Sequence, residues 1–193
     1  EPFDCEEIYK EFNIKSLHGQ SKDALAKTQI GNWRYDVTEP GYKCNMTDIQ
    51  ASMGLVELRR YERETLTRRE EIISQYIAGF EGHNQLLLPL VRSNDRVSSF
   101  HLYPVRLKDF SEEQRDRVVE EMYQRGISVN VHFIPLPMLT FYKKLGYKME
   151  DYPMTYRNFK CEISLPVYFD LRDDQVQQII TTFIQVVNQT MDQ

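Results

Sequence analysis

Apolar side chains recur at three- and four-residue intervals in four stretches of the chain, a spacing typical of helices that bury one face. Four other stretches have the apolar and β-branched composition of strands. The expected helices are residues 4–18, 48–80 with one break, 111–126, and a final helix whose apolar stripe is Val176, Ile179, Ile180, Phe183, Ile184 and Val187. The expected strands are residues 84–91, 98–107, 127–134 and 162–168. This order predicts a small α/β domain over residues 81–193.

Two of the expected helices begin with a capping box. The Thr47 hydroxyl can accept from the third helical N–H while Gln50 reaches back to the cap, and Ser111 and Gln114 repeat the pattern. In the helix after Thr47, mid-helix Gly54 costs about 1 kcal/mol against Ala. That cost favours close approach of another backbone at Gly54.

Composition and charge exclude several classes of protein. The net charge of −5 and the pI near 5.5 argue against nucleic acid as the main partner. In the arginine-rich run 57–71, glutamates at helical spacing offset the positive charges, as in a solvated helix. Cys5, Cys44 and Cys161 form no Cys-x-x-Cys pattern, so neither a disulfide framework nor a metal site is expected. Without a run of about 18 apolar residues or a signal peptide pattern, we expect a cytoplasmic protein with no membrane partner.

Residues 40–60 join a turn, a polar pair and a capped helix in the run Pro-Gly-Tyr-Lys-Cys-Asn-Met-Thr-Asp-Ile-Gln-Ala-Ser-Met-Gly-Leu-Val-Glu-Leu-Arg-Arg. This run resembles the Gly-x-Lys-Tyr-Asn-x-Thr-Asp-Ile-Gln-Ala-Ala-x-Gly-Leu signature of DegT-type sugar aminotransferases. Other stretches are similar to the family's patterns in the same order. They are Leu-His-Gly at 17–19, Trp-x-Tyr-x-Val-x-x-Pro-Gly at 33–41, Ser-x-His-Leu-Tyr at 99–103, Gly-Ile-x-x-x-Val-His-Phe-x-Pro-Leu at 126–136 and Ile-Ser-Leu-Pro-Val-Tyr at 163–168.

The resemblance implies a pyridoxal phosphate (PLP) enzyme that places an amino group on keto sugars carried by nucleotides. It also implies the fold class: the end of a PLP fold-type I large domain at residues 1–56, a long linker helix at 57–80 and a small C-terminal α/β domain at 81–193. In that family the lysine that holds PLP lies in an upstream Ser-x-His-x-x-Lys-x-x-Thr-Thr-Gly-Glu-Gly-Gly segment, which this sequence does not contain. The chain also opens at Glu1 without Met. We therefore expect a fragment that is inactive alone and binds PLP weakly or not at all.

The resemblance implies a cofactor contact at Asn45, whose amide N–H would donate across a dimer interface to the PLP phosphate of the partner subunit. Lys43 would supply a neighbouring positive charge. Many members place Asn at the Lys43 position and Arg at the Asn45 position, so the donor differs among relatives. Cys44 replaces a usual Tyr and removes an aromatic contact. The alternative is a turn in which Asn45 bonds only local backbone.

Four residues are candidates for substrate binding: His132, His18, Arg34 and Tyr35. Alternation with apolar neighbours puts Ser128, Asn130 and His132 on one polar face, which could line a sugar-nucleotide cleft or simply meet solvent. His18 stands in the family-like loop, either as a turn contact or at the margin of the active site. Arg34 and Tyr35 could contact the nucleotide or pack into the core. Pro137 stands where many relatives have His, so no second substrate histidine is expected.

The resemblance thus predicts the C-terminal part of an aminotransferase that takes its amino group from glutamate and works as a homodimer with shared active sites. Two alternatives stay open. The chain could be a non-catalytic dimerisation or sugar-nucleotide-binding module, or part of a PLP-dependent sugar dehydratase of the same family, which has His in place of the lysine.

Overall fold

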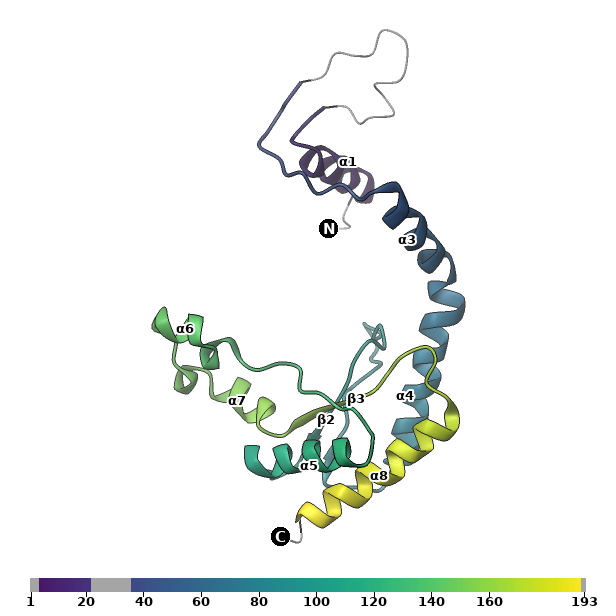
Figure 1. Ribbon diagram of the computed structural model, residues 1–193, viewed down its shortest axis with the longest axis vertical. Helices are drawn as coiled ribbons and strands as arrows, with labels where there is room; N and C mark the ends of the chain where they lie inside the picture. The colour runs from purple at the N-terminus through teal and green to yellow at the C-terminus, as the bar shows by residue number, and fades with distance from the viewer. Residues whose placement is uncertain (1–3, 22–35, 192–193) are drawn as a thin grey trace. The chain divides into compact units, whose positions relative to one another are not determined.

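The chain forms two compact units, residues 1–59 and 60–193. A computed structural model describes residues 4–21 and 36–191 (Figure 1). Within these ranges, every helix is too short or too polar to span a membrane.

The described residues of the N-terminal unit include two helices. Helix α1, Cys5–Ser16, is capped by the Asp4 carboxylate, which accepts from the backbone N–H groups of Glu6 and Glu7 at 3.0 and 3.2 Å. Helix α3 is Asp48–Arg60. Neither helix buries a residue within the described chain.

The capping box predicted before α3 is confirmed. The backbone N–H of Gln50 donates to the Thr47 hydroxyl at 3.4 Å, and the backbone N–H of Thr47 donates to the Gln50 side chain at 3.1 Å. The close approach expected at Gly54 is not made by the described residues, since none of their atoms lies within 4 Å of a Cβ built there.

The predicted break in the long helix is a π-helical turn. It covers Tyr61–Leu66 and leads into α4, Thr67–Gly79. Ile72, Ile73 and Tyr76 of α4 are fully buried in the C-terminal unit. The second half of the expected linker therefore contributes to the C-terminal core.

The C-terminal unit contains a three-stranded antiparallel sheet in the order β1-β2-β3. The strands are β1, Leu86–Leu87, β2, Tyr103–Leu107, and β3, Glu162–Leu165. They are shorter than predicted, and residues 127–134 form only an isolated bridge between Asn130 and Ser164. The reason is that alternation of apolar and polar residues indicates which side chains are buried, and not whether the backbone pairs with another strand. Ile127 and Val129 are buried here without a hydrogen-bonded ladder.

One face of this sheet carries the core. Helix α8, Asp173–Met191, packs against α4 and against α5, Glu112–Gln124, whose predicted capping box at Ser111 is present. The Tyr76 ring stacks on Tyr103 with centroids 5.3 Å apart, and Phe80 lies 5.6 Å from Phe183. The apolar stripe predicted for the last helix is thus the face that meets α4.

An arm of short helices connects α5 to β3. Figure 1 shows α6 and α7 on this segment, which reaches away from the sheet. The arm contains the 3-10 turn Leu136–Met138, α6, Thr140–Lys144, the 3-10 turn Met149–Asp151 and α7, Pro153–Phe159.

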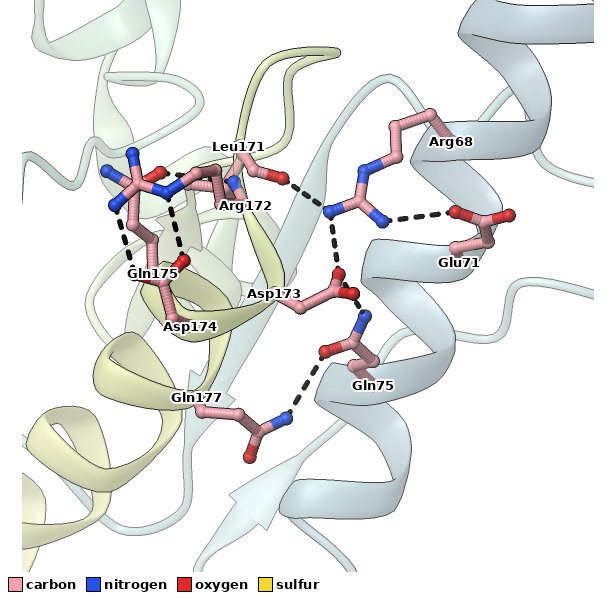
Figure 2. A network of polar contacts seen from close by, with 9 residues as sticks. All are labelled: Arg68, Glu71, Gln75, Leu171, Arg172, Asp173, Asp174, Gln175 and Gln177. Atoms are coloured by element: carbon pink, nitrogen blue, oxygen red, sulfur yellow. Dashed lines mark hydrogen bonds and ion pairs between the residues drawn. The ribbon is translucent and has the colours of Figure 1, made fainter.

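A polar network joins the start of α8 to α4 (Figure 2). Gln75 and Arg68 of α4 donate to the Asp173 carboxylate at 2.9 and 2.7 Å, and Arg68 also donates to the Leu171 carbonyl. These hydrogen bonds, that of Gln75 first, lower the pKa of Asp173 below its ordinary range. Asp174, one residue later, pairs with Arg172 at 3.0 Å, and no ion pair joins it to α4 among the described residues.

We predict that Asp173→Asn destabilises the chain at neutral pH more than Asp174→Asn does. Both variants remove one carboxylate from the first turn of α8, but only Asp173 bridges two helices. Because folding depresses the pKa of Asp173, its contribution is present above the unfolded pKa of about 3.9 and is lost as the pH falls through the lower folded value. Urea denaturation at neutral and acidic pH tests this. Equal stabilities of the two variants at neutral pH would contradict it.

Candidate functional site

The first group of candidate residues lies in the N-terminal unit, where two motif stretches far apart in sequence run side by side. The His18 N–H donates to the Tyr42 carbonyl at 2.8 Å, and the Cys44 N–H donates to the Ser16 carbonyl at 3.0 Å. Leu17 and Lys43 form an antiparallel bridge. The Leu-His-Gly stretch thus holds in place the chain that carries Lys43 and Asn45.

Two glycines make this pairing close. A Cβ built on Gly41 would lie 2.2 Å from the Gly19 nitrogen, and one built on Gly19 would lie 1.7 Å from the Glu39 carbonyl oxygen. Gly19 also has a φ of 73°, a conformation that side chains disfavour. Both positions therefore require glycine.

Lys43 and Asn45 contact one another directly. The Lys43 ammonium donates to the Asn45 side-chain oxygen, and both residues are exposed. No described residue accepts a hydrogen bond from the Asn45 amide nitrogen, and its side chain bonds no described backbone group. The pair therefore presents an ammonium and a free amide N–H, the donors that a phosphate group accepts from.

His18 is exposed, with a backbone φ of 60°, and its backbone serves the turn. Arg34 and Tyr35 lie outside the described residues. The structure thus places His18 in the turn at residues 17–20, and Lys43 and Asn45 on the stretch that pairs with that segment.

The second group surrounds His132 in the C-terminal unit. Ser128 and Asn130 are exposed and His132 is half-buried, while Ile127 and Val129 are buried, as the alternation predicts. The Nδ2 of Asn130 lies 3.5 Å from Nε2 of His132. The Nδ1 atom of His132 is shielded from solvent and has no hydrogen-bond partner among the described residues. Buried ring nitrogens usually have a hydrogen-bond partner, so this atom marks His132 as a candidate contact for a ligand.

A buried carboxylate, Glu162, fixes the backbone at His132. One Glu162 oxygen accepts from the His132 backbone N–H at 2.9 Å, and the other accepts from the Ser164 hydroxyl at 2.5 Å. Glu162 is only 6% exposed, and this burial raises its pKa, against the opposing effect of the two hydrogen bonds. Glu162 is not among the candidate residues predicted from the sequence. The available signal was an acid at the first position of an expected strand, 162–168.

A buried arginine supports the same strand. Arg115 of α5 is 2% exposed, and its guanidinium donates to the carbonyl oxygens of Phe159 at 2.8 Å and Glu162 at 3.3 Å. Its Nε also pairs with Asp116 at 2.6 Å. The positive charge near Glu162 is one of the weaker influences that lower the carboxylate pKa. His132, Glu162, Ser164 and Arg115 therefore form one connected polar group across α5, β3 and the loop before the arm.

Comparison with known proteins decides what this chain is related to. The profile of the DegT/DnrJ/EryC1/StrS aminotransferase family matches residues 3–184. The chain belongs to this family. The resemblance found in the motifs is thereby confirmed.

Relatives in this family include SpsC of Bacillus subtilis, a spore coat polysaccharide biosynthesis protein, 35% identical over 95% of this chain and 48% of its own length. A Campylobacter jejuni UDP-4-amino-4,6-dideoxy-N-acetyl-beta-L-altrosamine transaminase is 29% identical over 87% of this chain and 42% of its own. The PMP form of Spr1654 from Streptococcus pneumoniae, described as a sugar aminotransferase, matches with a TM-score of 0.84 and 47% identity, covering 97% of this chain and 47% of that one.

Two conclusions follow from these matches. The predicted fold class, a C-terminal α/β portion of a PLP-dependent aminotransferase fold, is confirmed by the likeness to Spr1654. The chain spans about half the length of the curated relatives it matches.

We predict that Glu162→Gln gains stability relative to the unsubstituted chain as the pH rises from about 4.3, the ordinary pKa of Glu, toward neutrality. Because burial raises the folded pKa, the unfolded chain ionises first, so Glu162 costs stability progressively over that range. The glutamine side chain has nearly the same shape as that of glutamate and stays uncharged at every pH of the series. Urea denaturation at a series of pH values measures the effect, with exposed Glu120→Gln as the control. Parallel pH profiles for Glu162→Gln and the unsubstituted chain would refute the prediction.

Proposed function

We propose that this chain is the C-terminal portion of a PLP-dependent aminotransferase that moves an amino group from glutamate to a keto sugar of a nucleotide sugar. The observation that carries the proposal is the Lys43 and Asn45 donor pair, held in a family motif ahead of α3. The polysaccharide role of SpsC and the UDP-sugar substrate named for the Campylobacter relative support amino-sugar biosynthesis for surface glycans.

The residues present fit the phosphate end of PLP. The Lys43 ammonium and the unused Asn45 amide N–H stand on one exposed stretch, and no acid of the described residues forms an ion pair with Lys43. When bound, PLP supplies an electron sink to the reacting carbon of the substrate. The role of this chain toward the cofactor is therefore to hold and orient its phosphate: Asn45 donates an N–H, and Lys43 adds charge.

The glycine pair and the capping box give that turn its rigidity. Close contact at Gly19 and Gly41 fixes the chain before Lys43, and the Thr47 cap fixes the chain after Asn45. Donors held in this way lose little conformational freedom when they bind an anion.

The His132 group is assigned to the sugar-nucleotide side. Glu162 orients the backbone at His132, which leaves the imidazole and the Asn130 amide to hydrogen-bond sugar hydroxyls or phosphate oxygens. In the N-terminal unit, His18 is assigned to the margin of the active site, and Arg34 and Tyr35 are assigned to contact with the nucleotide. None of these residues is assigned a covalent role.

The working form is proposed to be a cytoplasmic homodimer in which Asn45 serves the partner subunit's cofactor. One face of α3 supports an association surface, because Ile49, Met53 and Val56 share that face and are 75%, 67% and 58% exposed. Most of the stability of helices in proteins comes from packing of an apolar face, which favours a partner over this one.

We predict that Asn45→Ala in the full-length protein weakens PLP retention by about 1–3 kcal/mol, the loss of a charge-assisted hydrogen bond. Activity recovers in part with excess PLP. Cofactor dissociation followed by absorbance measures the loss. Asp48→Asn, an exposed change three residues away, is the matched control and leaves PLP retention unchanged.

Subunit mixing tests the cross-subunit contact. Asn45→Ala dimers are mixed with dimers whose PLP-binding lysine is replaced, so that each mixed dimer carries both lesions in one site and leaves the other site intact. Random exchange then restores about a quarter of the unsubstituted activity. No recovery, despite exchange verified by mass spectrometry, would show that Asn45 does not act across the interface.

A further inference from the structure

A cavity of 1030 Å³ lies in the C-terminal unit between the sheet and the arm. Its walls come from the end of β2 and the turn after it, the first residue of α5, and the arm between Pro137 and Lys160. The arm is the segment that carries α6 and α7 in Figure 1. The cavity has the volume of a small-molecule site. Neither His132 nor any other described candidate residue lines it.

The charges at this cavity are unbalanced. Its lining contains six basic side chains, Arg106, Lys108, Lys143, Lys148, Arg157 and Lys160, and three acidic ones, Asp109, Glu112 and Glu150. One of the acids is already engaged, since Glu112 accepts from the Tyr156 hydroxyl at 3.1 Å and lies 3.7 Å from Arg115. None of the four lysines forms a side-chain hydrogen bond or ion pair within the described ranges. The cavity therefore presents uncompensated positive charge.

The rest of the lining is apolar and aromatic. It includes Phe110, which is buried, Tyr147 and Tyr156, and three methionines, Met138, Met149 and Met154. Such walls suit a ligand with a ring or another apolar part, because aromatic faces and flexible thioethers pack well against it.

We propose that this cavity binds a small phosphorylated molecule that carries an apolar or ring-shaped body. Several unpaired lysines around one space favour a multiply charged anion, and lysine binds phosphate oxygens as a point charge. The guanidinium of Arg106 donates to the Asn158 side-chain oxygen at 2.6 Å. This hydrogen bond orients one cationic donor of the cavity before a ligand binds. A long polyanion such as nucleic acid is disfavoured, because the chain carries a net charge of −5.

Adjacent lysines on the arm provide a matched test. Lys143 lines the cavity and Lys144 does not, although both belong to α6. Inorganic pyrophosphate and phenyl phosphate are titrated into the 193-residue chain by calorimetry. We expect saturable binding, with phenyl phosphate gaining from the apolar walls. Lys143→Glu weakens both probes by about tenfold, and Lys144→Glu weakens them by less than about twofold.

The methionines locate the bound probe. Of the seven methionines in the chain, Met138, Met149 and Met154 line the cavity, while Met46, Met53 and Met191 are exposed elsewhere. In a chain labelled at the methionine methyl groups, the three lining signals shift on titration and the other three stay in place. Thermal unfolding of each variant confirms that it is folded.

Three outcomes would overturn this proposal: no saturable binding, equal weakening by Lys143→Glu and Lys144→Glu, or shifts confined to Met46 and Met53. The last outcome would place the anion at the Lys43 turn instead. Asn45→Ala separates the two sites, because it leaves the cavity affinity unchanged whether or not the proposed aminotransferase function holds.

Discussion

The C-terminal unit depends on the burial of one face of its sheet under α4 and α8. Tyr103, Val105 and Leu107 of β2 and Ile163 of β3 are fully buried, and the Tyr76 ring stacks on Tyr103 while its hydroxyl donates to the Pro166 carbonyl at 2.8 Å. Because side chains alternate along a strand, burying these residues turns the residues between them to the other face. The core therefore decides which side of the sheet remains available for polar chemistry.

That second face carries the polar residues of the unit. Arg106 of β2 stands opposite Glu162 of β3, and Ser164 follows two residues later. Glu162 anchors the His132 backbone, whereas Arg106 turns to Asn158 and the cavity beneath the arm. One polar face thus serves two places: a histidine group assigned to the sugar nucleotide and a basic cavity proposed for a phosphorylated ligand.

The described part of the N-terminal unit depends on a different constraint, the close approach of two backbone segments at Gly19 and Gly41. Its motif stretches fit together only because Gly19 and Gly41 have no side chain, and the pairing puts Lys43 and Asn45 on one exposed turn. The spacing of the motif residues therefore follows from the close backbone contact at Gly19 and Gly41 and from the helix cap at Thr47. The same geometry explains how a segment whose described helices bury no residue can still hold a defined pair of donors.

The sequence by itself determined what depends on neighbouring residues. The capping boxes at Thr47 and Ser111, the stripe of α8 and the α/β class of the C-terminal part follow from spacing within a few turns of chain, and the motifs indicated the family. Only the tertiary structure decided which residues pair across long separations. It left residues 127–134 as an irregular stretch joined to β3 by one bridge, with only Ile127 and Val129 buried. It also packed α4 into the C-terminal core and buried Glu162 beside His132. The reason is physical: caps and amphipathic stripes are local hydrogen bonds and periodicities, whereas burial, pKa shifts and cavities arise from segments brought together by packing.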